Sequence, residues 1–114
     1  MTTNLKKLND VLNVEPDITL DINENYDGFV DFYDKNKDVI YRNLVTLFKG
    51  FTESDKKTRT LAVTATIQDI PWGTEFVMDK NNKETLVHDI IPYFEQIEDY
   101  EFCEEIMGIY KSLN

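Results

Sequence analysis

A long amphipathic helix is the feature that most constrains how this chain folds. Apolar side chains recur at helical spacing over residues 29–51, and the inward positions are Phe29, Phe32 or Tyr33, Asn36, Ile40, Leu44, Leu47, Phe48 and Phe51. Asp27 is suited to the N-cap position, and Gly50 is a typical stop signal. Because such a helix needs an apolar surface to cover, we expect the face that carries Ile40, Leu44 and Phe48 to pack against a sheet.

The residues after this helix have the pattern of a β-hairpin. Residues 58–67 are rich in Thr, Val and Ile, with the apolar side chains alternating, and they predict a strand. The run 69–73 interrupts this pattern, and residues 74–78 predict the returning strand. Trp72, between a proline and a glycine, is therefore expected at the tip of the hairpin, either as an exposed anchor or folded back over the core.

The residues before the long helix predict three further segments. The first dozen residues have apolar side chains at helical spacing and predict a short helix. Residues 17–22 alternate apolar and polar side chains and indicate an extended segment, which we expect to be an edge strand. Residues 23–28 have the composition of a turn or loop.

Two more helices are expected at the C-terminal end. Asn81 and Glu84 have capping-box spacing, and Pro92 lies inside the helical pattern that follows, so we expect a kink or a break near Ile91. Asp99 can cap the last helix. The sequence thus predicts an α+β fold, a single domain over residues 1–114. A small antiparallel β-hairpin or sheet would pack against the long central helix and a C-terminal helical pair.

Composition restricts the class of protein. With 114 residues, of which 41% are hydrophobic, the chain can form a core without disulfides or metal. Cys103 is the only cysteine, so no intramolecular disulfide can form. No stretch approaches the ~20 apolar residues that cross a bilayer, and the first residues lack the apolar region of a signal peptide. We expect a cytoplasmic protein.

The net charge of −10 is concentrated in two segments. Residues 15–38 hold eight acids and two lysines, and residues 93–114 hold six acids and one lysine. A field of this sign repels nucleic acid and anionic membranes and favours a basic partner. The alternative is that the charge only keeps a small protein soluble. The predicted partner-binding residues are Glu98, Asp99, Glu101, Glu104, Glu105, Tyr100 and Trp72.

Residues 23–34 resemble the twelve-residue calcium loop of an EF-hand. Oxygen-bearing side chains fall at the spacing of its ligands, on Asn23, Asn25, Asp27, Asp31 and Asp34, and Gly28 falls at the sharp turn. The pattern departs from the family at its first position, an asparagine, and at its last, a short aspartate in place of glutamate. The segment before it does not predict the entering helix. The alternative is a turn that leads into a helix N-cap, so calcium binding, if present, is expected to be weak.

No catalytic motif is recognisable. The chain has no glycine-rich phosphate loop, nucleophile elbow or zinc-ligand spacing. His88 has no identifiable nucleophile or carboxylate partner for catalysis. Acids around Cys103 raise a thiol pKa, which is the wrong direction for a nucleophile, so we interpret it as a core residue. We expect a protein that is not an enzyme and has no cofactor beyond a weakly bound calcium ion.

Residues 97–106, Ile-Glu-Asp-Tyr-Glu-Phe-Cys-Glu-Glu-Ile, resemble the helical-hairpin ending of the UVR interaction motif of excision-repair proteins. This resemblance implies helix packing; the basic residues of the UVR version are absent, so its partner is not carried over. In its short, acidic, Asn-, Lys- and Ile-rich character the chain resembles accessory proteins of tailed phages.

These observations lead to three functional hypotheses. The first is a non-enzymatic protein-binding module, a phage-encoded acidic inhibitor or adaptor whose acids engage the basic, nucleic-acid-binding surface of a host protein. The second is a structural subunit of a larger assembly such as a virion, in which apolar edges and Trp72 make the contacts. The third is a weak divalent-cation-binding protein.

Overall fold

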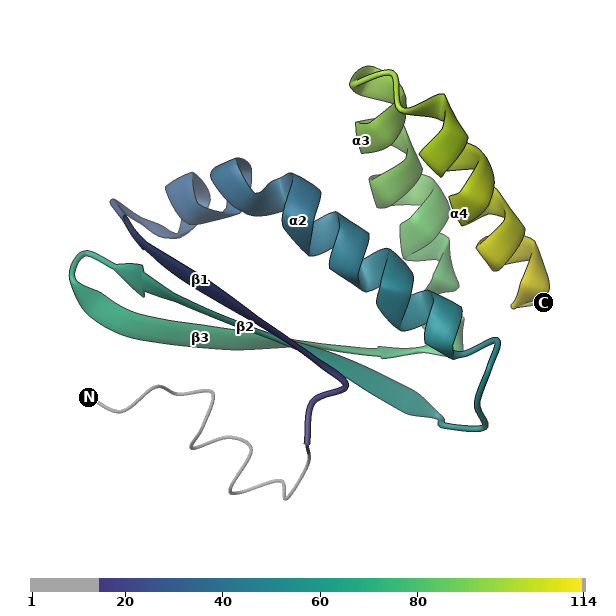
Figure 1. The fold of residues 1–114 in the computed structure, drawn as a ribbon, viewed down its shortest axis with the longest axis horizontal. Coiled ribbons are helices and arrows are strands. Elements are labelled where there is room, and N and C mark those ends of the chain that lie inside the picture. Colours follow the sequence, from purple (N-terminus) through teal and green to yellow (C-terminus); the bar gives the residue numbers. More distant parts are fainter. Residues whose placement is uncertain (1–14, 114) are drawn as a thin grey trace.

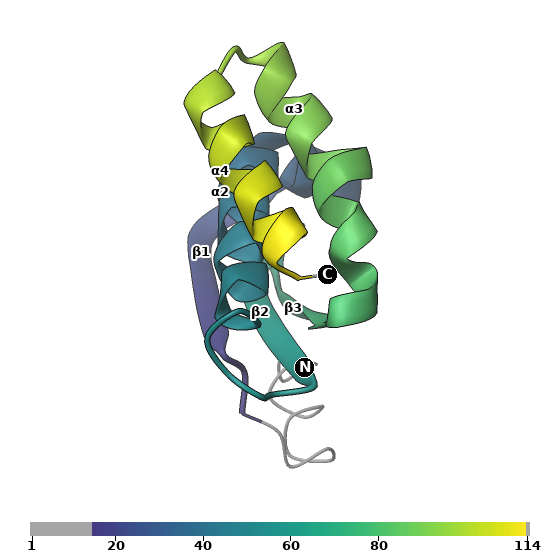
Figure 2. The same ribbon diagram turned by 90° about the vertical axis from the view of Figure 1, so that its right-hand side faces the viewer.

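The computed structural model describes residues 15–113, and the chain has an α+β fold. The elements in order are β1 (Ile18–Tyr26), α2 (Phe29–Gly50), β2 (Thr58–Ile67), β3 (Ile70–Asp79), the 3-10 turn η1 (Lys80–Lys83), the π-helical turn η2 (Leu86–Ile90), α3 (Ile91–Gln96) and α4 (Tyr100–Ser112). The helix predicted over the first dozen residues lies outside the described residues. The helices cover one face of the sheet (Figure 1), with α3 and α4 beside each other over α2 (Figure 2).

The sheet is mixed rather than antiparallel. β2 is the central strand, β3 pairs with it antiparallel as the predicted hairpin, and β1 pairs with it in parallel. The prediction of an antiparallel sheet is therefore wrong for β1. The reason is the crossover: α2 carries the chain back along the sheet, so β2 starts at the same end as β1.

β1 extends through residues that were expected to form a turn. Asn25 and Tyr26 still pair with Thr66 and Ile67 of β2, beyond an irregularity in the register. Asn25 Nδ2 donates to Asp69 Oδ1 at 3.0 Å, and the Asp69 backbone N–H donates to Asn25 Oδ1 at 3.0 Å. The prediction of a loop over residues 23–28 is wrong for residues 23–26, where strand pairing and this pair of bonds outweigh the turn-like composition, and it holds for residues 27–28.

The hairpin turn lies earlier than expected. Gln68 and Asp69 form it in the left-handed region, with φ of 50° and 65°, the signature of a two-residue type I′ turn. Trp72 is therefore not at the tip; it lies inside β3, opposite Ala65, and packs half-buried against the core. Pro71 and Gly73 are usually turn residues, and they put the predicted turn in the wrong place. Both lie inside β3, because an edge strand tolerates proline and glycine.

The long helix packs as predicted except at Phe29, which was expected to face inward and is 53% exposed because Phe32, 1% exposed, already fills the core at this end of the helix. Ile40, Leu44 and Phe48 of α2 are all buried and face the sheet, and they join the one cluster of buried side chains. The N-cap is Gly28 and not Asp27, and it makes no side-chain capping bond. Asp31 Oδ2 instead accepts from the Asp27 backbone N–H at 3.1 Å. A side chain in the first turn of the helix thus binds the backbone just before the helix.

The predicted irregularity near Pro92 is confirmed. The π-helical turn η2 ends at Ile90, and α3 starts with Pro92 in its first turn, where a missing N–H costs no helical hydrogen bond. The expected capping box of Asn81 and Glu84 is wrong. Asp79 accepts from the Asn81 backbone N–H, and Asn82 accepts from the Asp79 backbone N–H, so the box starts two residues earlier.

Candidate protein-binding surface

The turn between α3 and α4 presents the acids that the sequence singles out. α3 ends through Glu98, which has a left-handed backbone with φ of 62°, and the Asp99 backbone N–H donates to the Phe94 carbonyl at 2.8 Å. Asp99 Oδ1 accepts from the Phe102 backbone N–H at 3.3 Å, which confirms Asp99 as the cap of α4. The result is a tight helical hairpin that projects from the rest of the fold (Figure 1).

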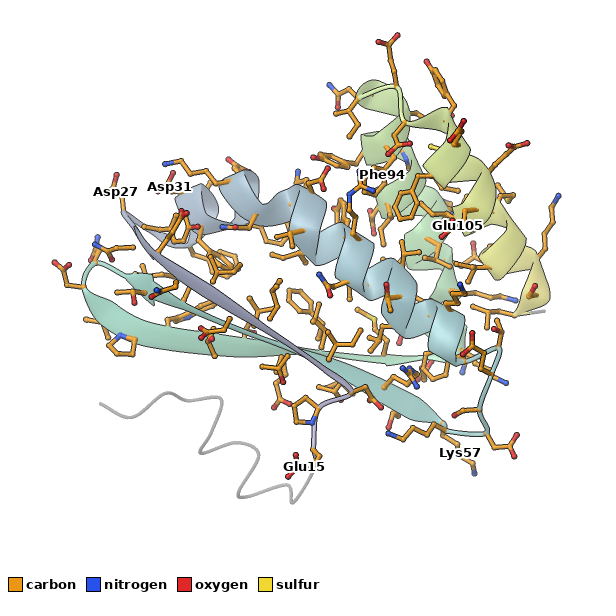
Figure 3. The ribbon with its side chains drawn as sticks, in the orientation of Figure 1. Glu15, Asp27, Asp31, Lys57, Phe94 and Glu105 are labelled. Atoms are coloured by element: carbon orange, nitrogen blue, oxygen red, sulfur yellow. The ribbon has the colours of Figure 1, made fainter. Side chains whose placement is uncertain are left out.

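Two large apolar side chains are exposed at this turn. Tyr100 is 60% exposed and Ile97 is 47% exposed, on either side of the cap. Acidic side chains surround them in the sequence and continue along the outward face of α4, where Figure 3 labels Glu105. We call this set the acidic hairpin surface: Glu95, Ile97, Glu98, Tyr100, Glu101, Glu104 and Glu105.

The glutamates of this surface are electrostatically unsatisfied. Within residues 15–113, the side chains of Glu98, Glu101, Glu104 and Glu105 are exposed and make no hydrogen bond or ion pair. Lys111 is the only basic residue on α4, and it lies in the last turn. The hairpin therefore carries an uncompensated negative charge around two exposed apolar groups.

Asp99 has a different role from its neighbours. Its Oδ2 accepts from Arg42 Nη2 of α2 at 3.1 Å, and Arg42 Nε also donates to Asp38 at 2.6 Å. These hydrogen bonds raise the pKa of the Arg42 guanidinium. The guanidinium carbon lies 4.8 Å from the ring centroids of both Phe94 and Phe102. Asp99 thus holds the hairpin on α2 and is not free for a partner.

We predict that the two roles of Asp99 separate by substitution. Asp99→Asn keeps a capping oxygen and loses the ion pair, so the free energy of unfolding falls by less than about 1 kcal/mol. Asp99→Ala also loses the cap, which costs about 1 kcal/mol more. Urea denaturation of the two variants checks this; equal losses would contradict the capping role.

Trp72 does not belong to the acidic hairpin surface. Its ring lies 5.4 Å from that of Phe29 and 5.1 Å from that of Phe32, both on the first turn of α2. The turn between α3 and α4, which carries the acidic hairpin surface, lies at the end of the molecule formed by these two helices (Figure 1). The structure therefore brings together the predicted hairpin residues and leaves Trp72 on a separate surface.

The residues of the EF-hand-like segment are divided between a strand and a helix. Asn23 and Asn25 are on β1, Asp31 and Asp34 are on α2, and Asp27 is between them. Gly28 is extended, with φ of −172°, and makes no sharp turn. Among residues 15–113, no group of three or more His, Cys, Asp or Glu side chains is placed to hold a metal ion. Weak calcium binding here stays a prediction.

Cys103 and His88 are the two catalytic candidates in the sequence. Burial, and then the charges of Glu95 and Asp99, raise the pKa of the Cys103 thiol, and its Sγ lies 3.7 Å from the Ile91 carbonyl. His88 is exposed, with Nε2 3.5 Å from Glu84. Neither arrangement supplies a nucleophile with an adjacent base.

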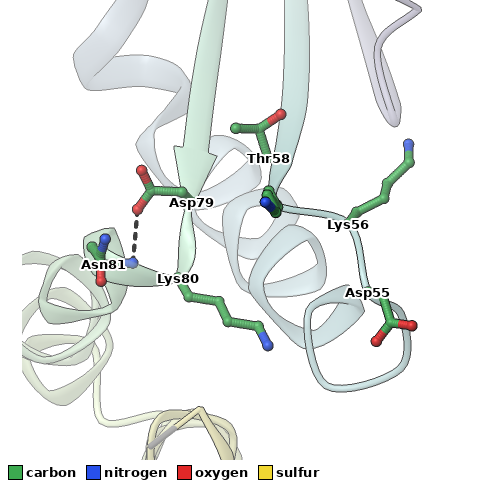
Figure 4. Close-up of a pocket in the computed structure, with 7 residues that line it drawn as sticks. Asp55, Lys56, Thr58, Asp79, Lys80 and Asn81 are labelled. Carbon is green, nitrogen blue, oxygen red and sulfur yellow. Dashed lines mark hydrogen bonds between the residues drawn. The ribbon is translucent and has the colours of Figure 1, made fainter.

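A pocket of about 490 Å³ lies where β2 begins and β3 ends (Figure 4). It is lined by Asp55, Lys56, Lys57, Thr58, Asp79, Lys80 and Asn81. Lys56 is paired with Asp17 at 2.5 Å, and the Asp79 carboxylate caps η1. Two aspartates offset much of the lysine charge, so this pocket has no strong preference for one kind of ion.

No helix within residues 15–113 is both long and apolar enough to cross a membrane. Comparison of the chain with protein-family models, curated proteins and solved structures gives no match.

Proposed function

We propose that this protein is a non-enzymatic protein-binding module that engages a basic surface of its partner through the acidic hairpin surface. One observation carries the proposal: exposed Ile97 and Tyr100 are surrounded by glutamates that have no partner within the described residues. Apolar and aromatic anchors inside a charged rim are the usual anatomy of a protein interface.

The two kinds of side chain make different contributions to binding. Tyr100 offers a large contact area with only two side-chain torsions to fix, which makes it a suitable anchor. The glutamates accelerate association with a basic partner and set its orientation, and their effect decreases as salt increases. The rigid attachment of the hairpin through Arg42 limits the entropy lost on binding.

The class of partner follows from the sign and spacing of the charge. Glu101, Glu104 and Glu105 form a row on the outward face of one helix. Such a row can occupy positions that phosphates take on a nucleic-acid-binding surface and so block it. We therefore propose an inhibitor or adaptor that acts on such a protein in the cytoplasm, of the kind that tailed phages encode.

We predict that removing four charges from the acidic hairpin surface weakens binding about tenfold and lowers its salt dependence. The variant is Glu98→Gln, Glu101→Gln, Glu104→Gln and Glu105→Gln combined. These side chains are exposed and unpaired, so the melting temperature should change little. The measurement is capture of partners from cell lysate on immobilised protein, with elution by increasing salt.

A matched control distinguishes the effect of the acidic hairpin surface from the effect of the protein's total net charge. Glu15→Gln, Glu53→Gln, Asp55→Asn and Asp89→Asn remove the same charge from exposed positions outside α3 and α4. The control should retain the partner at wild-type salt. An equal loss of partner binding in both variants, or capture of a partner that salt does not affect, would contradict the proposal. Recovery of only this chain itself would favour the hypothesis of a structural subunit.

A further inference from the structure

A second apolar surface lies where α2 starts, apart from the acidic hairpin surface. We call it the Trp72 patch and define it as Phe29, Tyr33, Ile70 and Trp72. Phe29 meets Trp72 edge to face at 5.4 Å and stacks with Tyr33 at 6.1 Å. Ile70 is two residues before Trp72 on β3 and so lies on the same face of the strand. Phe29 and Ile70 are each 53% exposed.

The core does not require this exposure. Phe32, which is 1% exposed, already closes the core beneath Trp72 at 5.1 Å. Phe29 packs on the outside of that pair, at the first position of α2, where a polar residue would serve the helix equally well. Exposed apolar groups that adjoin one another and are rimmed by polar residues are typical of interaction sites in soluble proteins.

Acidic side chains surround the Trp72 patch. Asp27 and Asp31 lie side by side at the start of α2 (Figure 3). Asp69, in the turn between β2 and β3, precedes Ile70, and its two hydrogen bonds with Asn25 hold it against the end of β1. The two lysines nearby, Lys35 and Lys37, already interact with other side chains.

Two lysines are close to these acids. Lys35 pairs with Asp31 at 3.0 Å, and Lys37 lies 5.7 Å from the Tyr33 ring centroid. The surroundings of the Trp72 patch therefore keep a net negative charge. A second copy of this chain would bring acids against acids across a symmetric contact, which disfavours self-association. A basic segment with apolar side chains would complement both the exposed apolar groups of the patch and the negative charge around it.

We propose that the Trp72 patch is a second docking surface, which takes a basic peptide segment of another protein. An apolar side chain of that segment packs on Phe29 and Ile70, and its Arg or Lys groups pair with Asp27 and Asp69. An arginine can also stack on the exposed aromatic edge. This goes beyond the proposed function, because it concerns a different surface, and either can fail alone.

Trp72 makes the test direct, since it is the only tryptophan in the chain. The probe is a synthetic peptide of alternating leucine and arginine, titrated at low salt while the Trp72 fluorescence is recorded. We expect a saturable change in emission for the wild type and for the four-glutamate hairpin variant. A peptide of alternating leucine and glutamate should cause none.

Substitutions in the patch identify the contact. Phe29→Ala with Ile70→Thr should weaken binding of the peptide about tenfold, and Asp27→Asn with Asp69→Asn should weaken it mainly at low salt. Ile70→Thr alone keeps a β-branched strand residue, so it tests the contact even if the double variant unfolds. An unchanged Trp72 signal, an affinity that none of these variants alters, or a dimer dissolved by Phe29→Ala would overturn the proposal.

Discussion

Phe94→Ala should lower the free energy of unfolding by about 3–5 kcal/mol, the largest loss that we expect from a substitution near the acidic hairpin surface. Phe94 is fully buried, and its ring contacts Phe102 at 4.7 Å and Tyr93 at 4.9 Å. It lies between α2 and the hairpin helices (Figure 3). Truncation leaves a cavity where α3, α4 and α2 meet.

Urea denaturation followed by circular dichroism measures this loss. Since small domains are stable by only about 5–15 kcal/mol, the alanine variant can be largely unfolded at room temperature. Phe94→Leu then gives the measurable value, with a smaller loss than alanine because less volume is removed. Val77→Ala, on the exposed side of β3, should change stability by no more than about 0.5 kcal/mol. A Phe94→Ala loss as small as that of Val77→Ala would contradict the packing described here.

Arg42→Ala should lower the free energy of unfolding by about 2–3 kcal/mol, which is unusually large for a half-exposed residue. The guanidinium has contacts of two kinds, with Asp38 and Asp99 at its edge and with two phenylalanine rings at its faces. Its removal also leaves two carboxylates without their cation. We expect the hairpin to loosen from α2 before the sheet unfolds.

Arg42→Met separates packing from charge. Methionine retains an apolar side chain against the two rings but no cation, so its loss should be about half that of alanine. A double-mutant cycle of Arg42→Met with Asp99→Asn should give a coupling energy of about 0.2–1 kcal/mol, as for other solvent-exposed ion pairs. Equal losses for alanine and methionine would show that charge alone fixes the hairpin.

Local patterns predicted the helices and the central strand. The period of α2, the alternation of β2 over Thr58–Ile67 and the cap at Asp99 depend on neighbours within one or two turns, and each is found as expected. The parallel pairing of β1 was missed because it depends on the crossover through α2. The hairpin turn was missed because Gln68 and Asp69 are unusual in a type I′ turn, whereas Asn-Gly pairs are the common signal.

The charges of the candidate surface and its exposed Tyr100 were predictable from the sequence, but Ile97 was not. The outward glutamates of α4 follow from helical spacing once Asp99 is taken as the cap. Ile97 was missed because an isoleucine before a cap is usually a packing residue, and only the left-handed turn at Glu98 leaves it exposed. The Arg42–Asp99 pair joins residues 57 positions apart, for which local sequence holds no signal.

Site-specific photo-crosslinking from Tyr100 tests the central claim most directly. A photoreactive phenylalanine derivative replaces Tyr100 in one variant and Val77, on the sheet, in the other, and both are irradiated in lysate. The account predicts a salt-sensitive adduct with a basic protein from position 100 and none from position 77. An adduct from position 77 alone, or adducts only between copies of this chain, would contradict it.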